Sequence, residues 1–315
     1  MGPLYYMKHY LKILSFILIT GSVIVGNAQG EYCREMQLLL QKFKQKDYAG
    51  SKLYLDTVIK KCPDRKLDSY YWHISGFVHM NVFKNIDNKS PISKSREIAV
   101  ESFLKSKKLD LKAKYLENTS KALKYLSNTF YNDAILILQN MDTLHFDEIN
   151  SFYYRYKDIT KAITPNYNFD QKDIEMNYGL GMLYKAKYEN NKKAYRHFMD
   201  SSINCFNRAI TLNPLHYSSN YNLGIIYHNL GVDIILDDLE IDADLEKVII
   251  MQEKAIGYFS QALPYLKKVY EMEPTDKAII QGIAAVYYSL NDMEKHVEFM
   301  NVLKDLDNSS MPNNK

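Results

Sequence analysis

Residues 180–184 read LGMLY and residues 223–227 read LGIIY, so one Leu-Gly-x-x-Tyr pattern occurs twice in the C-terminal half. Each copy is followed by a stretch that ends in a polar residue and a proline, first Asn213-Pro214 and then Glu273-Pro274. Proline has no amide hydrogen and cannot continue a helix, so each of these pairs predicts a helix end. The recurrence predicts a chain built from repeated helical units.

The spacing resembles that of the tetratricopeptide (TPR) repeat, a unit of about 34 residues with the pattern W-x2-L-G-x2-Y, then A-x3-F, then P. When the chain is aligned with this pattern, Gly181 and Gly224 occupy the place where a small residue lets the two helices of a repeat approach closely. The resemblance implies that Tyr184 and Tyr227 fill the space between repeats. The resemblance implies an all-α fold, a TPR-like α-solenoid of about six antiparallel helical hairpins with insertions between the helices of some repeats.

Along the chain, the pattern predicts four regions. They are a signal peptide (1–28), degenerate TPR-like hairpins (29–165), a C-terminal TPR array (166–307) and a disordered tail (308–315). The soft boundary between the two repeat regions lies where turn-forming residues cluster, over residues 164–170.

Several helix limits depart from the regular repeat. A third hairpin is expected from a helix over 109–127 and a short partner over 131–139. Asn190-Asn191 predicts a turn inside an insertion of about nine residues. About 26 extra residues follow Gly231, and Pro264 predicts a kink or a restart in the last long helix.

The N-terminus has the layout of a secretory signal. Lys8 and Lys12 precede an apolar run over 13–25, and Gly26-Asn27-Ala28 provides the small residues of a cleavage site. The run is shorter than the roughly 20 apolar residues of a membrane span, although an uncleaved anchor is the alternative. We therefore expect an exported protein, in the periplasm or at the cell surface of a bacterium.

Export makes a disulfide permissible among the three cysteines. Cys33 is expected to start the first helix and Cys62 to end the second, and these ends are neighbours in an antiparallel hairpin. A Cys33–Cys62 bridge and two buried free thiols both fit this placement. Cys205 is expected in a helix core.

Charge is unevenly distributed. Residues 31–130 carry nine more basic than acidic residues, and residues 131–315 carry eight more acidic than basic ones. The basic half is either a solvated face or a contact for a membrane surface or an acidic protein. Nucleic acid is not expected as a partner of an exported chain that lacks a known binding module.

The acidic run over 237–246 is a weak calcium site, a solvated loop or the amphipathic start of a helix. It lacks the glycine and the terminal glutamate of an EF-hand loop. No catalytic or nucleotide-binding pattern is found, so neither an enzyme nor a cofactor is expected.

The TPR resemblance implies a concave groove lined by the first helix of each repeat. The residues at the corresponding places are Tyr178, Met182, Lys185, Tyr221, Asn222, Ile225, His228, Gln281, Ala285 and Tyr288. They differ from the Lys, Asn and Arg set with which chaperone-binding members of the family hold a carboxylate. A tyrosine-rich groove favours a peptide or an amphipathic helix as ligand, unless these tyrosines only pack between repeats.

The sequence thus predicts a non-enzymatic scaffold of the bacterial cell envelope that binds another protein. A glycan-binding accessory protein with tyrosine platforms is one alternative. An uncharacterised enzyme is the other.

Overall fold

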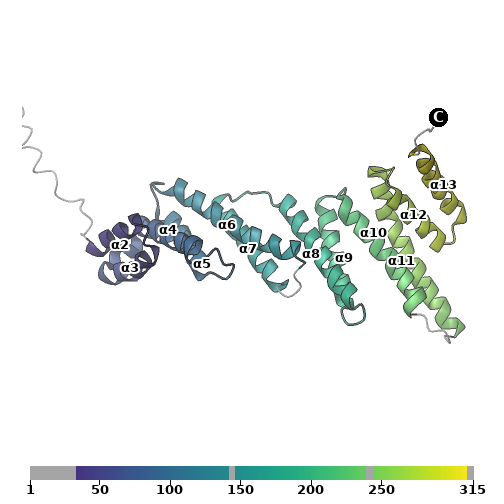
Figure 1. Cartoon of the computed structure of the whole chain (residues 1–315), viewed down its shortest axis with the longest axis horizontal. Helices are drawn as coiled ribbons and strands as arrows, with labels where there is room; N and C mark the ends of the chain where they lie inside the picture. Colours follow the sequence, from purple (N-terminus) through teal and green to yellow (C-terminus); the bar gives the residue numbers. More distant parts are fainter. Residues whose placement is uncertain (1–32, 142–145, 239–243, 311–315) are drawn as a thin grey trace, which may run out of the picture. The chain divides into compact units, whose positions relative to one another are not determined.

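The computed structural model describes residues 33–141, 146–238 and 244–310 (Figure 1). These residues form α-helices joined by short connections and include no strand, which confirms the predicted all-α class. The helices are α2 (Arg34–Lys44), α3 (Tyr48–Lys61), α4 (Ser69–Asn85), α5 (Lys94–Leu109), α6 (Leu116–Gln139), α7 (Phe146–Ile163), α8 (Asp170–Asn190), α9 (Arg196–Leu212), α10 (Tyr217–Asp233), α11 (Leu245–Met272), α12 (Lys277–Ser289) and α13 (Met293–Ser310). A 3-10 helix, η1 (Pro63–Leu67), precedes α4, and a π-helical turn, η2 (Ile234–Asp238), follows α10.

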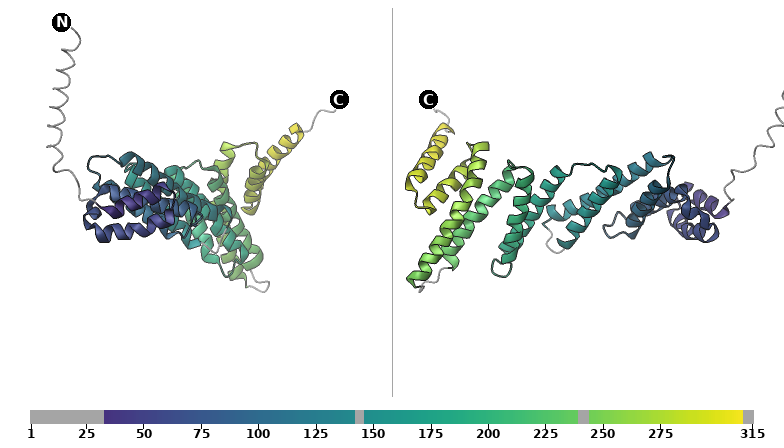
Figure 2. Two further views of the ribbon diagram at one scale, coloured as in Figure 1. Left: turned by 60° about the vertical axis from the view of Figure 1, so that its left-hand side comes forward. Right: turned by 180° about the vertical axis from the view of Figure 1, so that it is seen from behind.

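The chain divides into two compact units, the first ending at Leu126 and the second beginning at Ser127. In the first unit α2 packs on α3 and α4 on α5. In the second, α8 packs on α9, α10 on α11 and α12 on α13, and these pairs lie side by side in the views of Figures 1 and 2. The division falls inside α6, whereas the sequence pattern placed a boundary over 164–170.

Short polar side chains begin several helices. The carboxylate of Asp47 accepts the amide hydrogen of Gly50 at 2.8 Å, and that of Asp68 accepts the amide hydrogen of Tyr70 at 2.9 Å. Asp276 does the same for the first turn of α12. Each cap satisfies an amide that has no partner within its own helix, and so stabilises the helix by about 1 kcal/mol.

Glycines on the first helix of a pair lie directly against large side chains of the second. A Cβ atom added to Gly181 would lie 2.7 Å from the ring of Phe206, and one added to Gly224 would lie 2.6 Å from Leu266. In the first unit the same distance from Gly76 to the ring of Phe103 is 2.6 Å. All three large side chains are fully buried. No side chain larger than hydrogen fits at these glycines without moving the opposite residue, so close helix packing depends on them.

The third helix pair differs from its prediction. Residues 116–139 form one continuous helix, α6, so the predicted break between 127 and 131 is wrong, and residues 110–115 form a loop. The partner of α6 is α7, because the Ser127 hydroxyl lies 2.7 Å from the hydroxyl of Thr160 and donates to the Tyr156 carbonyl at 3.3 Å. A small residue again faces the second helix at the point of close approach.

Other limits agree with the pattern or extend it. Helix α8 ends at Asn190, which confirms the predicted turn. Helix α11 runs through Pro264 without interruption, so the predicted restart is wrong, and the alternative of a kink stays a prediction. Helix α13 continues to Ser310, so the predicted tail is helical over 308–310.

The predicted signal peptide (1–28), the middle of the acidic run and the last five residues lie outside the described residues. Among the helices of the described part, none combines the length and the apolar character that a membrane span requires.

The three cysteines lie in the described part. Cys33 and Cys62 form a disulfide that joins the start of α2 to the end of α3, with a sulfur–sulfur distance of 2.04 Å. Cys205 carries a free thiol and is buried in α9.

Candidate functional site

The predicted groove residues of α8 are partly buried against neighbouring side chains. The Tyr178 ring lies 6.0 Å from the ring of Phe206 and 5.5 Å from that of His216. Met182 packs against a buried cluster that contains Leu223 of α10. These two residues therefore help to join successive helix pairs.

The predicted residues of α10 also contribute mainly to packing. Tyr221 stacks on Tyr217 with ring centres 6.5 Å apart, and both rings and Ile225 lie against the core shared by α11 and α12. Asn222 is buried and donates to the carbonyl of Ser218 at 2.8 Å. His228 lies 5.5 Å from the ring of Phe259, and burial lowers the pKa of its imidazole, which favours the neutral form.

The predicted residues of α12 are more open. Gln281 is exposed, Tyr288 is 62% exposed, and Ala285 is half-buried. The Tyr288 ring lies 5.4 Å from that of His296 on α13, which leaves most of its surface in water.

A cavity of about 250 Å³ lies between α8, α9 and α10, next to the predicted groove residue Lys185. Its apolar wall is formed by Tyr188, Met199, Ile226 and Leu230. Its polar lining residues are Lys185, Glu189, Lys192, Asn229 and Asp233.

The lysines that line this cavity are held differently. Lys192 binds both carboxylate oxygens of Asp233 at 2.7 and 2.8 Å, which links the connection after α8 to the end of α10. Lys185 makes two longer contacts, at 3.5 Å to the side-chain oxygen of Asn222 and at 3.8 Å to the carboxylate of Glu189. Charged hydrogen bonds prefer about 2.8 Å, so Lys185 has the capacity to form a shorter contact with an anionic group.

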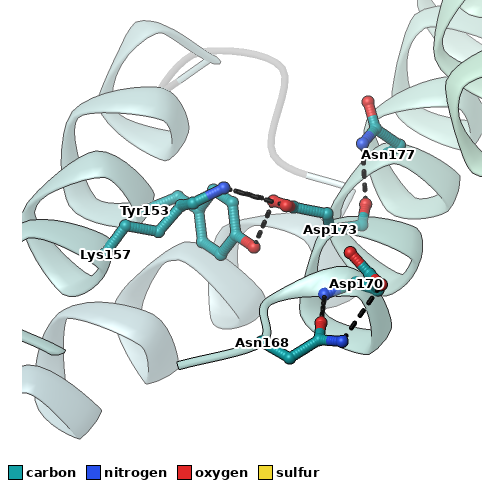
Figure 3. Close-up of polar contacts among 6 residues, drawn as sticks. All are labelled: Tyr153, Lys157, Asn168, Asp170, Asp173 and Asn177. Carbon is teal, nitrogen blue, oxygen red and sulfur yellow. Dashed lines mark hydrogen bonds and ion pairs between the residues drawn. The ribbon is translucent and has the colours of Figure 1, made fainter. Parts of the chain in front are cut away.

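A polar and aromatic cluster joins α7 to α8 (Figure 3). The Tyr153 hydroxyl donates to Asp173 at 2.7 Å, and Lys157 donates to both oxygens of the same carboxylate at 2.8 and 2.9 Å. The Lys157 ammonium also lies 4.9 Å from the centre of the Phe169 ring. Burial, together with the hydrogen bond to Asp173, raises the pKa of Tyr153, so its phenol stays protonated and donates.

The start of α8 adds further bonds to this cluster. The Asn168 side chain accepts the amide hydrogen of Asp170 at 2.7 Å, and Asn177 donates to the Asp173 carbonyl at 2.7 Å (Figure 3). Nearby, the Tyr131 hydroxyl donates to Glu175 at 2.5 Å. The tyrosine hydroxyls are thus used to connect α6, α7 and α8, which is the behaviour of a structural network.

No metal site is indicated within the described ranges. The group of His, Cys, Asp and Glu ligand atoms found close together there consists of Cys33, Glu35 and Cys62, and its two sulfur atoms are bonded to each other. The predicted calcium ligands of the acidic run lie partly outside these ranges.

Sequence reasoning named Lys185 but missed the cavity beside it. The cavity arises because helix α8 extends to Asn190 and the connection between α8 and α9 reaches the end of α10. There Lys192 binds Asp233, a residue 41 positions further along the chain. The insertion of about nine residues after Tyr188 was the available signal, because insertions within repeats form loops on one face of the array, which is often the binding face. The chain matches no protein-family model, and a search of the curated proteins finds none similar to it.

Proposed function

We propose that the protein is an exported, TPR-like helical-repeat scaffold of a bacterial cell envelope that binds a segment of another protein. It has no catalytic role and needs no cofactor. The proposed ligand is a peptide or an amphipathic helix laid along the first helices of successive repeats, α8, α10 and α12.

The observation that carries this proposal is the packing register of the helix pairs. The same small-against-large contact recurs between Gly181 and Phe206 and between Gly224 and Leu266, at the places that the TPR resemblance assigns to it. A solenoid built in this way turns the first helices of its repeats toward one surface, which is the usual ligand surface of such arrays.

Two features suggest where the ligand contacts this surface. Among the described residues, the polar contacts of Lys185 are both long, and the residue lies beside a cavity with an apolar wall. Tyr288 is largely exposed on α12. An acidic group near an apolar anchor would pair with Lys185 while the anchor fills the cavity.

Partner capture from an envelope extract, followed by mass spectrometry, tests the proposal. The bait variants are Lys185→Glu and Tyr288→Ser. The matched control is Tyr154→Ser, because Tyr154 is 64% exposed and lies on α7, which is not one of the three helices of the proposed surface. A partner retained by the control and lost by both bait variants, with unchanged helicity, supports the proposal. A partner that all three proteins capture equally contradicts this binding surface. Tyr221 and His228 are poorer targets, because both pack against the core.

The glycan-binding alternative requires aromatic faces that are exposed together. Among the described residues, the exposed tyrosines are Tyr154, Tyr167 and Tyr288, which lie on α7, before α8 and on α12. Because these tyrosines are spread along the chain, we favour protein binding over glycan binding as the proposed function.

A further inference from the structure

Two leucines project from neighbouring loops of the first unit. Leu67 ends η1 and is 78% exposed, and Leu111, in the loop between α5 and α6, is 94% exposed. Over residues 33–126, most large aliphatic side chains are buried or half-buried. Single exposed aliphatic side chains, such as Leu53 and Ile92 in the same unit, are ordinary on a protein surface, whereas two on adjacent loops contribute to one apolar patch.

Both loops meet at the start of α4. The Trp72 indole donates to the carbonyl of Lys66 at 2.9 Å, which attaches η1 to α4. On the other side, the Ser106 hydroxyl donates to the carbonyl of Ser69 at 2.9 Å, and the ring of Tyr70 lies 5.4 Å from that of Tyr115. Leu67 and Leu111 therefore lie at the same end of the α4–α5 pair.

The loop that carries Leu111 has a defined conformation. The Asp110 carboxylate accepts the amide hydrogens of Lys114 at 2.9 Å and Tyr115 at 2.6 Å. The Ala113 amide donates to the Asp110 carbonyl at 3.0 Å. These bonds hold Leu111 at the tip of a closed turn, so its exposure is built into the loop.

The same end of the unit is strongly basic. Residues 60–68 contain four basic and two acidic residues, and residues 105–114 contain five basic and one acidic. These two short segments therefore account for six of the nine excess positive charges of residues 31–130. The exposed lysines around the leucines are Lys66, Lys105, Lys108, Lys112 and Lys114.

The only tryptophan of the chain lies just behind this surface. The Lys105 ammonium is 3.9 Å from the centre of the Trp72 ring. Tyr70 and Tyr115 flank the same region. Amphipathic aromatic rings behind exposed aliphatic tips, with lysines around them, suit the boundary between lipid headgroups and acyl chains.

We propose that this end of the first unit, defined by Leu67, Leu111 and the five surrounding lysines, docks on an anionic lipid bilayer. The leucines enter the headgroup boundary, and the lysines pair with phosphate groups. A bilayer accepts an aliphatic tip at any lateral position, whereas a protein partner must provide a shaped pocket for each leucine. That difference, together with the positive charge, favours a membrane over an acidic protein as the occupant. This proposal is independent of the proposed groove on α8, α10 and α12.

The test uses Trp72 as a reporter, because its emission comes from this surface and from nowhere else in the full chain. Phosphatidylcholine vesicles with bromine-labelled acyl chains are prepared with and without phosphatidylglycerol. We expect quenching of Trp72 by the vesicles that contain phosphatidylglycerol and little quenching by the others. About 1 M salt reduces the screening length to about 3 Å and should abolish the effect.

Three variants separate the contributions. Leu67→Ser with Leu111→Ser should weaken vesicle binding by about tenfold or more, because two aliphatic side chains no longer leave water. Lys112→Glu with Lys114→Glu should weaken it by at least about fivefold for each lysine. Ile92→Ser is the matched control. Ile92 is 82% exposed in the loop that joins the end of α4 to α5, away from the start of α4, and its replacement should change nothing.

Several results would overturn the proposal. One is equal quenching of Trp72 by vesicles with and without phosphatidylglycerol. Another is unchanged quenching in the double leucine variant when its helicity is also unchanged. A third is a shift of Trp72 emission with an acidic polypeptide such as polyglutamate but not with vesicles, which would identify a protein as the partner.

Discussion

Reduction of the Cys33–Cys62 disulfide should destabilise the first unit selectively. The two cysteines are 29 positions apart, so the bond closes a loop of about 30 residues in the unfolded chain. In the chain-entropy model the loss of this constraint costs about 3.6 kcal/mol at 25 °C. A single compact unit has a total stability of about 5–15 kcal/mol, so the effect is a large part of the stability of this unit.

Trp72 makes the measurement specific to the first unit, because it packs against the core cluster that contains Cys33. Urea denaturation followed by Trp72 fluorescence should give a midpoint about 1.2–3.6 M lower after reduction, for a urea dependence of roughly 1–3 kcal/mol per molar. Reductant should have no effect on the Cys33→Ser, Cys62→Ser double variant, which serves as the control. If the Trp72 midpoint is unchanged while a thiol assay shows complete reduction, the reasoning is refuted.

Three further predictions concern buried polar groups. Burial lowers the pKa of His79 from 6.5 to about 4, with a further lowering from Lys52, so the unfolded chain binds a proton first as pH falls. The free energy of unfolding of the first unit should therefore drop by about 3 kcal/mol between pH 6.5 and 4. Denaturation curves of His79→Leu should show a weaker dependence of this free energy on pH. The same dependence in the variant as in the original protein would contradict the prediction. Asp173→Asn should lower the free energy of unfolding by about 2–3 kcal/mol, because it leaves the half-buried Lys157 ammonium without its charged partner. Tyr153→Phe removes one hydrogen bond and should lower it by about 1 kcal/mol. Equal melting temperatures of the two variants would contradict this difference. Burial raises the pKa of Cys205 to about 11, so its reaction with an aromatic disulfide reagent at pH 8 should be at least about a hundredfold slower than in urea, and equal rates would show that the thiol is accessible.

The fold could be predicted from the sequence at positions where the type of residue has a single structural cause. Gly181 and Gly224 marked close helix packing because no other residue leaves that space, and the structure places Phe206 and Leu266 against them. Asn190 marked a helix end for a similar local reason.

The third helix pair was misjudged because its signal is weaker. Around α6 the pattern reads Leu126-Ser127-x-x-Phe130, with serine where other repeats have glycine, and no matching alanine and phenylalanine follow on α7. Ser127 performs the same packing role through its hydroxyl contact with Thr160. A serine in a helix is too common to be recognised as a packing residue without its partner in view.

The candidate sites depend on contacts that are distant in sequence. Periodicity places Lys185 on a helix face, but it does not bring Lys192 to Asp233 or reveal the cavity that they flank. Similarly, Leu67 and Leu111 read as ordinary loop residues, and only the bonds around the start of α4 bring them to one surface. Such juxtapositions result from packing, which local sequence patterns do not specify.

The central claim is that the helix pairs pack in a TPR-like register, and the most direct test is the stability of matched glycine variants. Gly181→Ala places a methyl group against the buried Phe206 ring, at a cost of about 1–3 kcal/mol that exceeds the gain of about 0.8 kcal/mol in helix propensity. Gly257→Ala, where no atom lies within 4 Å of the added carbon, should instead stabilise the protein by about 0.5–1 kcal/mol. The account predicts a lower melting temperature for Gly181→Ala, partial recovery on adding Phe206→Leu, and a higher one for Gly257→Ala. Equal or higher stability of Gly181→Ala would contradict it.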